Sequence, residues 1–137
     1  MSELKIPQRI FLEMLAQAQA EAPIEACGIL AGSENHVQEF YKMTNSDQST
    51  DHFMMAPTEQ FAVAKQMRAK QQQMLAIYHS HPASPARPSA EDIRLALTPD
   101  VLYVVLSLQE PAEPQIRGFT IENDVVSESA VKIVGED

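Results

Sequence analysis

The sequence predicts an α/β domain of the α+β kind, in which a mixed β-sheet is flanked by helices. Two patterns favour this class: apolar residues recur at helical spacing over 8–22, and short apolar runs typical of buried strands occupy 74–82 and 101–108. The length of 137 residues is enough for one hydrophobic core and leaves little room for a second domain. We therefore expect three helices, six or seven strands and a single domain over residues 1–137.

The amino-terminal part of the chain predicts a helix followed by a hairpin. The amphipathic helix spans 8–22, and Pro23 marks its end. Residues 26–32 form a short apolar run bounded by turn formers, and residues 36–43 alternate loosely with β-prone side chains. We interpret these two segments as paired strands.

The middle of the chain predicts a loop, a short strand, a helix and a buried strand. Segment 45–51 is polar and leads into an expected short strand at 52–55. Pro57 suits the first turn of a helix that continues to about Gln73, through residues that are mostly good helix formers. The apolar run that follows, 74–82, turns polar at its end, where a buried strand would deliver two histidines to an edge.

The carboxy-terminal part predicts further strands. Prolines make 82–88 a loop, and a short helix is expected from about Ser89 to Ala96. The 101–108 run is a second buried strand. Residues 114–121 and 125–134 supply two or three more, with Asn123-Asp124 as the hairpin turn.

Composition excludes several classes of function. A net charge of −9 argues against nucleic-acid binding, because such affinity comes from clustered lysine and arginine. The single cysteine, Cys27, cannot form an intramolecular disulfide, and we interpret it as a small buried strand residue. The sequence has no signal-peptide pattern and no apolar stretch long enough for a membrane span. We expect a cytoplasmic protein with no membrane or nucleic-acid partner.

Two histidines at the end of the 74–82 strand form the most informative pattern. Alternate side chains of a strand share a face, so His79 and His81 can direct their imidazoles toward one metal ion. Asp92 follows after the proline-rich loop, and the chain could fold back to add its carboxylate. Two imidazoles and one carboxylate leave a fourth position for water, which is typical of catalytic zinc.

Each piece of this pattern also has an ordinary structural explanation. A His-x-His pair is more often two polar residues at a strand end, and Ser89 with Asp92 resembles a helix capping box. Glu25 could be a solvated residue in the turn before a strand. His36 and His52 lack ligand spacing with another candidate, and both could lie on the surface, although His52 could line a cleft.

The complete pattern resembles that of the JAMM (MPN+) zinc metallopeptidases. The motif His-Ser-His-Pro at 79–82 is followed by Ser89-x-x-Asp92, with seven residues between His81 and Ser89, as in the family. Segment 23–32, which contains Glu25, looks like the family's glutamate-bearing segment. The resemblance spans the chain from the first helix to the strand after Asp92. It implies an MPN/JAB-like fold with a central, curved, mixed sheet.

The resemblance also implies a role for each residue. His79, His81 and Asp92 would bind one Zn²⁺ ion per chain. Glu25 would serve as the acid/base, and Ser89 would stabilise the oxyanion. Zinc can lower the pKa of bound water from 15.7 to about 7, which makes hydroxide available at neutral pH.

The function implied is hydrolysis of a peptide or isopeptide bond in a protein or peptide substrate. The family acts on C-terminal tails of ubiquitin-like proteins, including di-glycine sulfur-carrier proteins in short prokaryotic members. The minimal loop between His81 and Asp92 favours this stand-alone prokaryotic type. Two alternatives stay open, a noncatalytic MPN-type scaffold and a protein that binds metal without turnover, and the sequence leaves the oligomeric state undetermined. An exposed edge near 52–55 could hold the substrate by strand addition.

Overall fold

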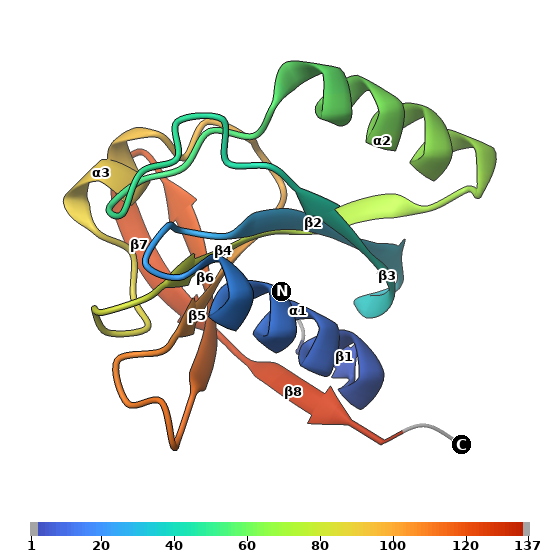
Figure 1. Ribbon diagram of the computed structural model, residues 1–137. Helices are drawn as coiled ribbons and strands as arrows, with labels where there is room; N and C mark the ends of the chain where they lie inside the picture. Colours follow the sequence, from blue (N-terminus) through green and yellow to red (C-terminus); the bar gives the residue numbers. More distant parts are fainter. Residues whose placement is uncertain (1–2, 136–137) are drawn as a thin grey trace.

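The computed structural model describes residues 3–135 and contains three helices and eight strands, all of the strands in one sheet (Figure 1). The strand order in the sheet is β7-β6-β5-β4-β2-β3-β1-β8. The elements follow along the chain as β1 (Leu4–Pro7), α1 (Gln8–Glu21), β2 (Cys27–Ser33), β3 (His36–Met43), α2 (Pro57–Ala69), β4 (Gln73–His81), α3 (Ala90–Arg94), β5 (Leu102–Ser107), β6 (Gln115–Glu122), β7 (Val125–Ser129) and β8 (Val131–Val134).

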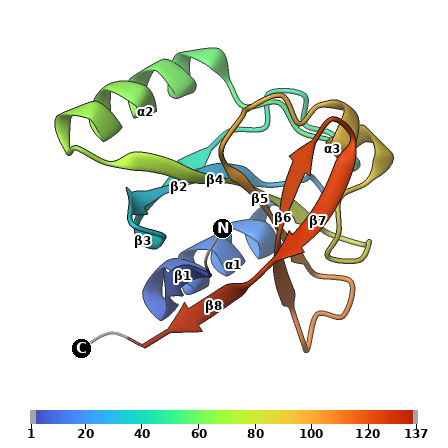
Figure 2. The same ribbon diagram turned by 180° about the vertical axis from the view of Figure 1, so that it is seen from behind.

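The sheet curls back on itself until its two ends nearly meet. Strands β7 and β8 lie at opposite ends of the strand order, yet only Ala130 separates them in the chain. Figure 2 shows the two strands following one another along the back of the molecule. At the junction a Cβ atom added to Gly118 of β6 would lie 2.6 Å from Val131 Cγ2 of β8. A residue without a side chain therefore allows the close approach of the two ends.

The two faces of the curled sheet carry different helices. Helix α1 covers one face, where its buried residues join a core that includes Leu30, Tyr78 and Leu106. Helix α2 lies on the opposite side of the sheet (Figure 1), where Val63 and Met67 pack against residues of β2 and β3. Both faces of β2 and β4 are thus covered, and the second face of β5 packs against Ile93 and Ala96, which explains why these central strands are apolar in sequence.

The side chains of β4 alternate between the two faces of the sheet, so that the core residues lie on one face and the two histidines on the other. Ala76 and Tyr78 face α1, and the Tyr78 hydroxyl donates a hydrogen bond to the Met14 carbonyl of that helix (3.2 Å). His79 and His81, which alternate with these residues along the strand, consequently point to the other face, where α3 lies. The expected shared face for the two histidines is therefore confirmed.

The predicted α+β class, the curved mixed sheet and the three helices are confirmed. The predicted turn at Asn123-Asp124 is confirmed as well, because both residues have positive φ angles (50° and 65°), as the tightest hairpin turns require. The described residues contain no helix that is long and apolar enough to cross a membrane.

Three expectations were wrong in detail. The count of six or seven strands omitted β1, which forms by parallel pairing with β3 and β8. Residues 52–55 form no strand; Met55 makes only one isolated bridge, to Asn45. Helix α2 ends at Ala69 and not near Gln73, because the chain turns there to enter β4.

Candidate metal centre

Three separate segments bring four potential ligands together. Glu25 lies just before β2, His79 and His81 end the neighbouring strand β4, and Asp92 lies in α3. One ligand atom from each residue lies within 4.8 Å of those of the other three, and all four residues are buried. Of the predicted site residues, only Ser89 contributes no atom to this metal cluster, although it adjoins Asp92.

The three closest ligand atoms form a nearly equilateral triangle. Asp92 Oδ2 lies 3.0 Å from Nε2 of His79 and 3.0 Å from Nε2 of His81, and the two nitrogens are 3.1 Å apart. His81 Nδ1 lies 2.8 Å from the Pro85 carbonyl, a contact in which the nitrogen must donate. In the neutral His81 ring Nε2 is then an acceptor, so it and the Asp92 carboxylate face one another as two acceptors. Such a group needs a proton or a cation at its centre.

The donor set and its dimensions fit zinc. Two imidazole nitrogens and a carboxylate oxygen are common zinc ligands, and tetrahedral bonds of about 2.0–2.1 Å separate two ligand atoms by about 3.3 Å. The observed separations of 3.0–3.1 Å are close to this value. The residues could hold one Zn²⁺ with little movement.

Asp92 is positioned by the first turn of α3. Ser89 is the N-cap: its Oγ accepts a hydrogen bond from the Asp92 N–H (3.1 Å), and Asp92 Oδ2 accepts one from the Ser89 N–H (2.9 Å). This capping box is the structural role that the sequence allowed for the pair. Burial disfavours the Asp92 carboxylate, but hydrogen bonds from His79 and His81 outweigh it and hold its pKa well below the usual range. Asp92 is therefore an anion at neutral pH.

Glu25 differs from Asp92 in its surroundings. Its Oε2 lies 4.0 Å from His81 Nε2, and its buried Oε1 has no hydrogen-bond partner within the part of the chain that the structure describes. Burial raises the pKa of Glu25 from 4.5 to about 8. The carboxyl group can thus hold or release a proton near neutral pH, as an acid/base must.

The two histidines also differ. Phe53 stacks on the His79 ring at a centroid distance of 4.7 Å, and burial lowers the pKa of this ring, so it stays neutral and able to bind metal. Burial opposes charge on His81 as well, but the hydrogen bonds to Asp92 and Pro85 outweigh it and raise its pKa. In the absence of metal, His81 is therefore the natural proton carrier of the triangle.

A family model described as prokaryotic homologs of the JAB domain matches residues 7–121, a span that includes the whole metal cluster. The chain belongs to the JAB family. The resemblance to JAMM/MPN+ proteins found in the sequence is therefore confirmed.

Relatives of this JAB protein cover nearly its full length. A CysO-cysteine peptidase of Mycobacterium tuberculosis is 36% identical over 123 residues, 88% of this chain and 84% of the relative. A desampylase of Pyrococcus furiosus is 29% identical, with 98% and 92% covered. A protein of Desulfitobacterium hafniense with a solution structure has 43% identity and a TM-score of 0.88, covering 96% of this chain and 93% of that one. The CysO-cysteine peptidase and the desampylase confirm the prediction of a hydrolase.

Three positioning residues of the JAB site were not found from the sequence. Asn45 donates hydrogen bonds to the carbonyls of Glu25 and His52, both at 3.0 Å, and so ties the loop after β3 to the segment that carries Glu25. Ser80, between the two histidines, accepts a hydrogen bond from the Ala26 N–H (2.8 Å). Phe53 stacks on His79. Only Asn45 had a local signal, as an Asx residue at the start of a polar loop.

The remaining candidate residues lie outside the cluster. His52 contacts Asp47 and Asp51 on the loop, and His36 is exposed at the start of β3. Cys27 is fully buried in β2, and burial raises its pKa to about 12, so it is inert packing as expected.

Proposed function

We propose that this JAB protein is a zinc-dependent metallopeptidase that hydrolyses a peptide or isopeptide bond at the C-terminal tail of a ubiquitin-like or sulfur-carrier protein. The observation that carries the proposal is the buried cluster of two imidazoles and two carboxylates whose ligand atoms lie within 4.8 Å of one another. A CysO-cysteine peptidase and a desampylase among the relatives support a substrate of this kind.

Each residue of the cluster has a distinct part in the proposed reaction. His79, His81 and Asp92 would hold the zinc, which when bound supplies an acidified water and polarises the scissile carbonyl. Glu25 lies beyond this triangle, so its carboxylate can accept the proton of the attacking water and return it to the leaving amine.

Ser89 would stabilise the negative charge that develops on the carbonyl oxygen. Its Oγ accepts a hydrogen bond from the Asp92 N–H, and that bond uses an oxygen lone pair and leaves the hydroxyl proton free to donate. A donor placed beside the metal can therefore serve the oxyanion and still cap α3.

A noncatalytic scaffold is the alternative from another class. A scaffold has no need of Glu25, whose burial without a partner for Oε1 costs stability. That cost is explained if the carboxyl group exchanges a proton with a substrate.

The deciding experiment incubates the purified protein with di-glycine sulfur-carrier proteins that bear short C-terminal extensions, read by intact mass. We expect about one zinc per chain, as in a mononuclear site, and loss of the extension, abolished by a chelator and restored by zinc. The double variant His79→Ala/His81→Ala should contain no zinc and leave the substrate intact, with circular dichroism confirming that it folds. Undiminished zinc in this variant would refute the site, and full zinc without cleavage would favour the metal-binding alternative.

A further inference from the structure

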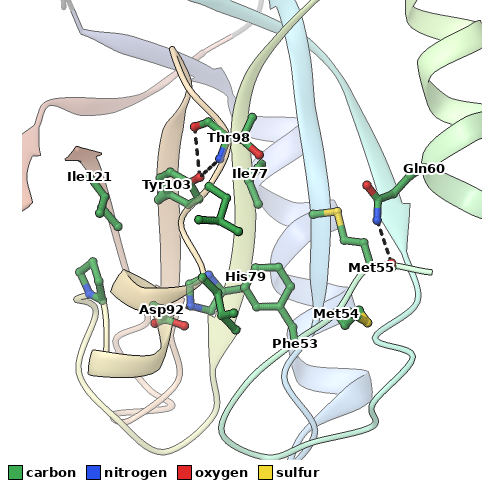
Figure 3. Close-up of a pocket in the computed structure, with 13 residues that line it drawn as sticks. Phe53, Met54, Met55, Gln60, Ile77, His79, Asp92, Thr98, Tyr103 and Ile121 are labelled. Atoms are coloured by element: carbon green, nitrogen blue, oxygen red, sulfur yellow. Dashed lines mark hydrogen bonds and ion pairs between the residues drawn. The ribbon is translucent and has the colours of Figure 1, made fainter. Parts of the chain in front are cut away.

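A pocket of about 270 Å³ opens directly beside the metal cluster (Figure 3). His79 and Asp92 form part of its wall, so a group that fills it lies next to the reacting atoms. In Figure 3 the Phe53 ring lies against His79, with Met54 and Met55 on the same side of the pocket. The other lining residues are Gln60, Ile77, Pro88, Leu95, Leu97, Thr98, Tyr103 and Ile121.

Exposed apolar side chains gather around this pocket. Leu97 is 81% exposed, Met54 is 55% exposed and Leu95 is 44% exposed, and all three line it. Phe61 of α2, 74% exposed, lies in a neighbouring hollow that shares Gln60 with the pocket. Exposed large apolar residues that cluster at a concave site indicate that a ligand covers them.

Outside the metal cluster, the polar residues Gln60, Thr98 and Tyr103 of the pocket wall already make hydrogen bonds within the protein. The Gln60 side-chain amide donates to the Met55 carbonyl (2.9 Å), and the Thr98 backbone N–H and carbonyl both pair with the Tyr103 hydroxyl. A charged group that entered would lose its hydration and gain no matching contact. The pocket therefore selects for an apolar occupant.

We propose that this pocket binds the side chain of the residue that supplies the leaving amine, and that the enzyme prefers an uncharged apolar side chain there. This inference rests on the proposed function. The acyl side of the scissile bond in a di-glycine tail consists of two residues without side chains, so they cannot fill a pocket of this size. The residue on the other side of the bond is the nearest one with a side chain to place beside His79 and Asp92.

The test uses a sulfur-carrier protein with one residue added after its di-glycine, and the zinc-loaded enzyme. Leucine and aspartate are matched probes because their side chains have similar shape, and alanine serves as the small reference. We expect kcat/KM to fall in the order leucine, alanine, aspartate, with leucine at least about tenfold above aspartate, as pocket contacts of this kind give in other enzymes. Equal rates for the three substrates would overturn the inference and leave the proposed function intact. Cleavage of none of them would overturn both.

A pair of variants locates the preference in the pocket. Leu97→Asp puts a negative charge at the rim. With a fourth substrate that carries lysine after its di-glycine, the variant should lower the leucine-to-lysine ratio of kcat/KM by at least about tenfold, with zinc content unchanged. Leu12→Asp is the matched control, because Leu12 is 51% exposed on α1, which covers the opposite face of the sheet. An unchanged ratio in Leu97→Asp, or the same change in both variants, would overturn the assignment.

Binding can also be measured without turnover. Leucinamide, an uncharged-carboxyl analogue of the leucine that hydrolysis releases, added to protein with ¹³C-labelled methionine methyl groups should shift the signals of Met54 and Met55. Met14 of α1 packs in the core on the other face of the sheet and should not shift. A shift at Met14 in place of the other two, or no shift at any methionine, would contradict the pocket assignment.

Discussion

Glu25 and Asp92 are carboxylates of one buried cluster, yet their surroundings move their pKa values in opposite directions. Burial without a partner for Oε1 raises the pKa of Glu25, whereas hydrogen bonds from two imidazoles and the Ser89 N–H hold that of Asp92 low. Carboxyl groups separated in this way take different roles in catalysis. The permanently charged Asp92 suits a metal ligand, and the titratable Glu25 suits an acid/base.

The first prediction concerns the acid/base group. Glu25→Gln keeps the size of the side chain but cannot accept a proton, so the variant should retain about one zinc per chain and lose about 10²–10⁴-fold in kcat. Metal analysis and intact-mass assays of the same preparation measure both quantities. Glu34→Gln, at the exposed hairpin turn, is the control and should be as active as the wild type. Full activity in Glu25→Gln would exclude the acid/base role.

At the scale of elements, sequence patterns predicted correctly those helices, strands and turns that depend mainly on interactions between residues close in the chain. The β3 strand and the hairpin turns follow from alternation and turn residues, and the start of α2 follows from Pro57 at its first position. Strand β1 was missed because its four residues carry no local pattern and form a strand only by pairing with β3 and β8, far along the chain. The prediction of a strand at 52–55 was wrong for the opposite reason. Its residues are β-prone, but they pair with no other strand and make only one isolated bridge.

The same distinction applies to the site. Spacing alone placed the two histidines on one face, and the family motif pointed to Asp92 and Glu25, all of which the fold brings together. Phe53 was not predicted, because its stacking on His79 depends on a loop whose course is set by long-range hydrogen bonds.

The second prediction concerns the short helix α3. Ser89→Ala removes the side-chain cap, which should lower the free energy of unfolding by about 1 kcal/mol. The capped turn also orients Asp92, so zinc affinity should fall about 10–100-fold, as is typical when a group that supports a metal ligand is lost. Thermal unfolding and competition with a chromophoric chelator measure the two effects.

Ser84→Ala is the matched control for that variant, because Ser84 is exposed in the same loop and only its backbone carbonyl is used, by the Ser107 hydroxyl. It should change neither stability nor zinc affinity. If Ser89→Ala keeps full zinc affinity and loses only turnover, the serine acts on the oxyanion and not on the position of Asp92.

At the scale of the whole molecule, the curled sheet depends on the contact between its two ends. Gly118 of β6 and Val131 of β8 meet where the sheet nearly closes, and the space there admits no Cβ atom without movement of a stiff β-branched side chain. In the sheet register Gly118 lies beside Val104 of β5, which lies beside Tyr78 of β4, a residue that faces α1 and not the metal cluster.

The third prediction tests this junction. Gly118→Ala should lower the free energy of unfolding by about 1–3 kcal/mol through overpacking, and the double variant Gly118→Ala/Val131→Ala should recover much of the loss. Chemical denaturation of the four proteins in the cycle gives the coupling. Gly135→Ala, where an added Cβ would meet no atom within 4 Å, should have no effect. Additive effects of the two substitutions would show that the contact does not hold the ends of the sheet.

The alternation in β4 has a consequence for how the chain folds correctly. A slip of β4 by one residue against β2 would send both histidines into the core, and a slip of two would leave the faces correct but draw the histidines away from Glu25 and Asp92. Tyr78, which donates to the Met14 carbonyl, and Ser80, which accepts from the Ala26 N–H, make bonds that either slip would break. Tyr78 and Ser80 precede and follow His79 in β4, and their hydrogen bonds hold the strand in one register. The most stable alignment of β4 is therefore also the alignment that assembles the metal centre.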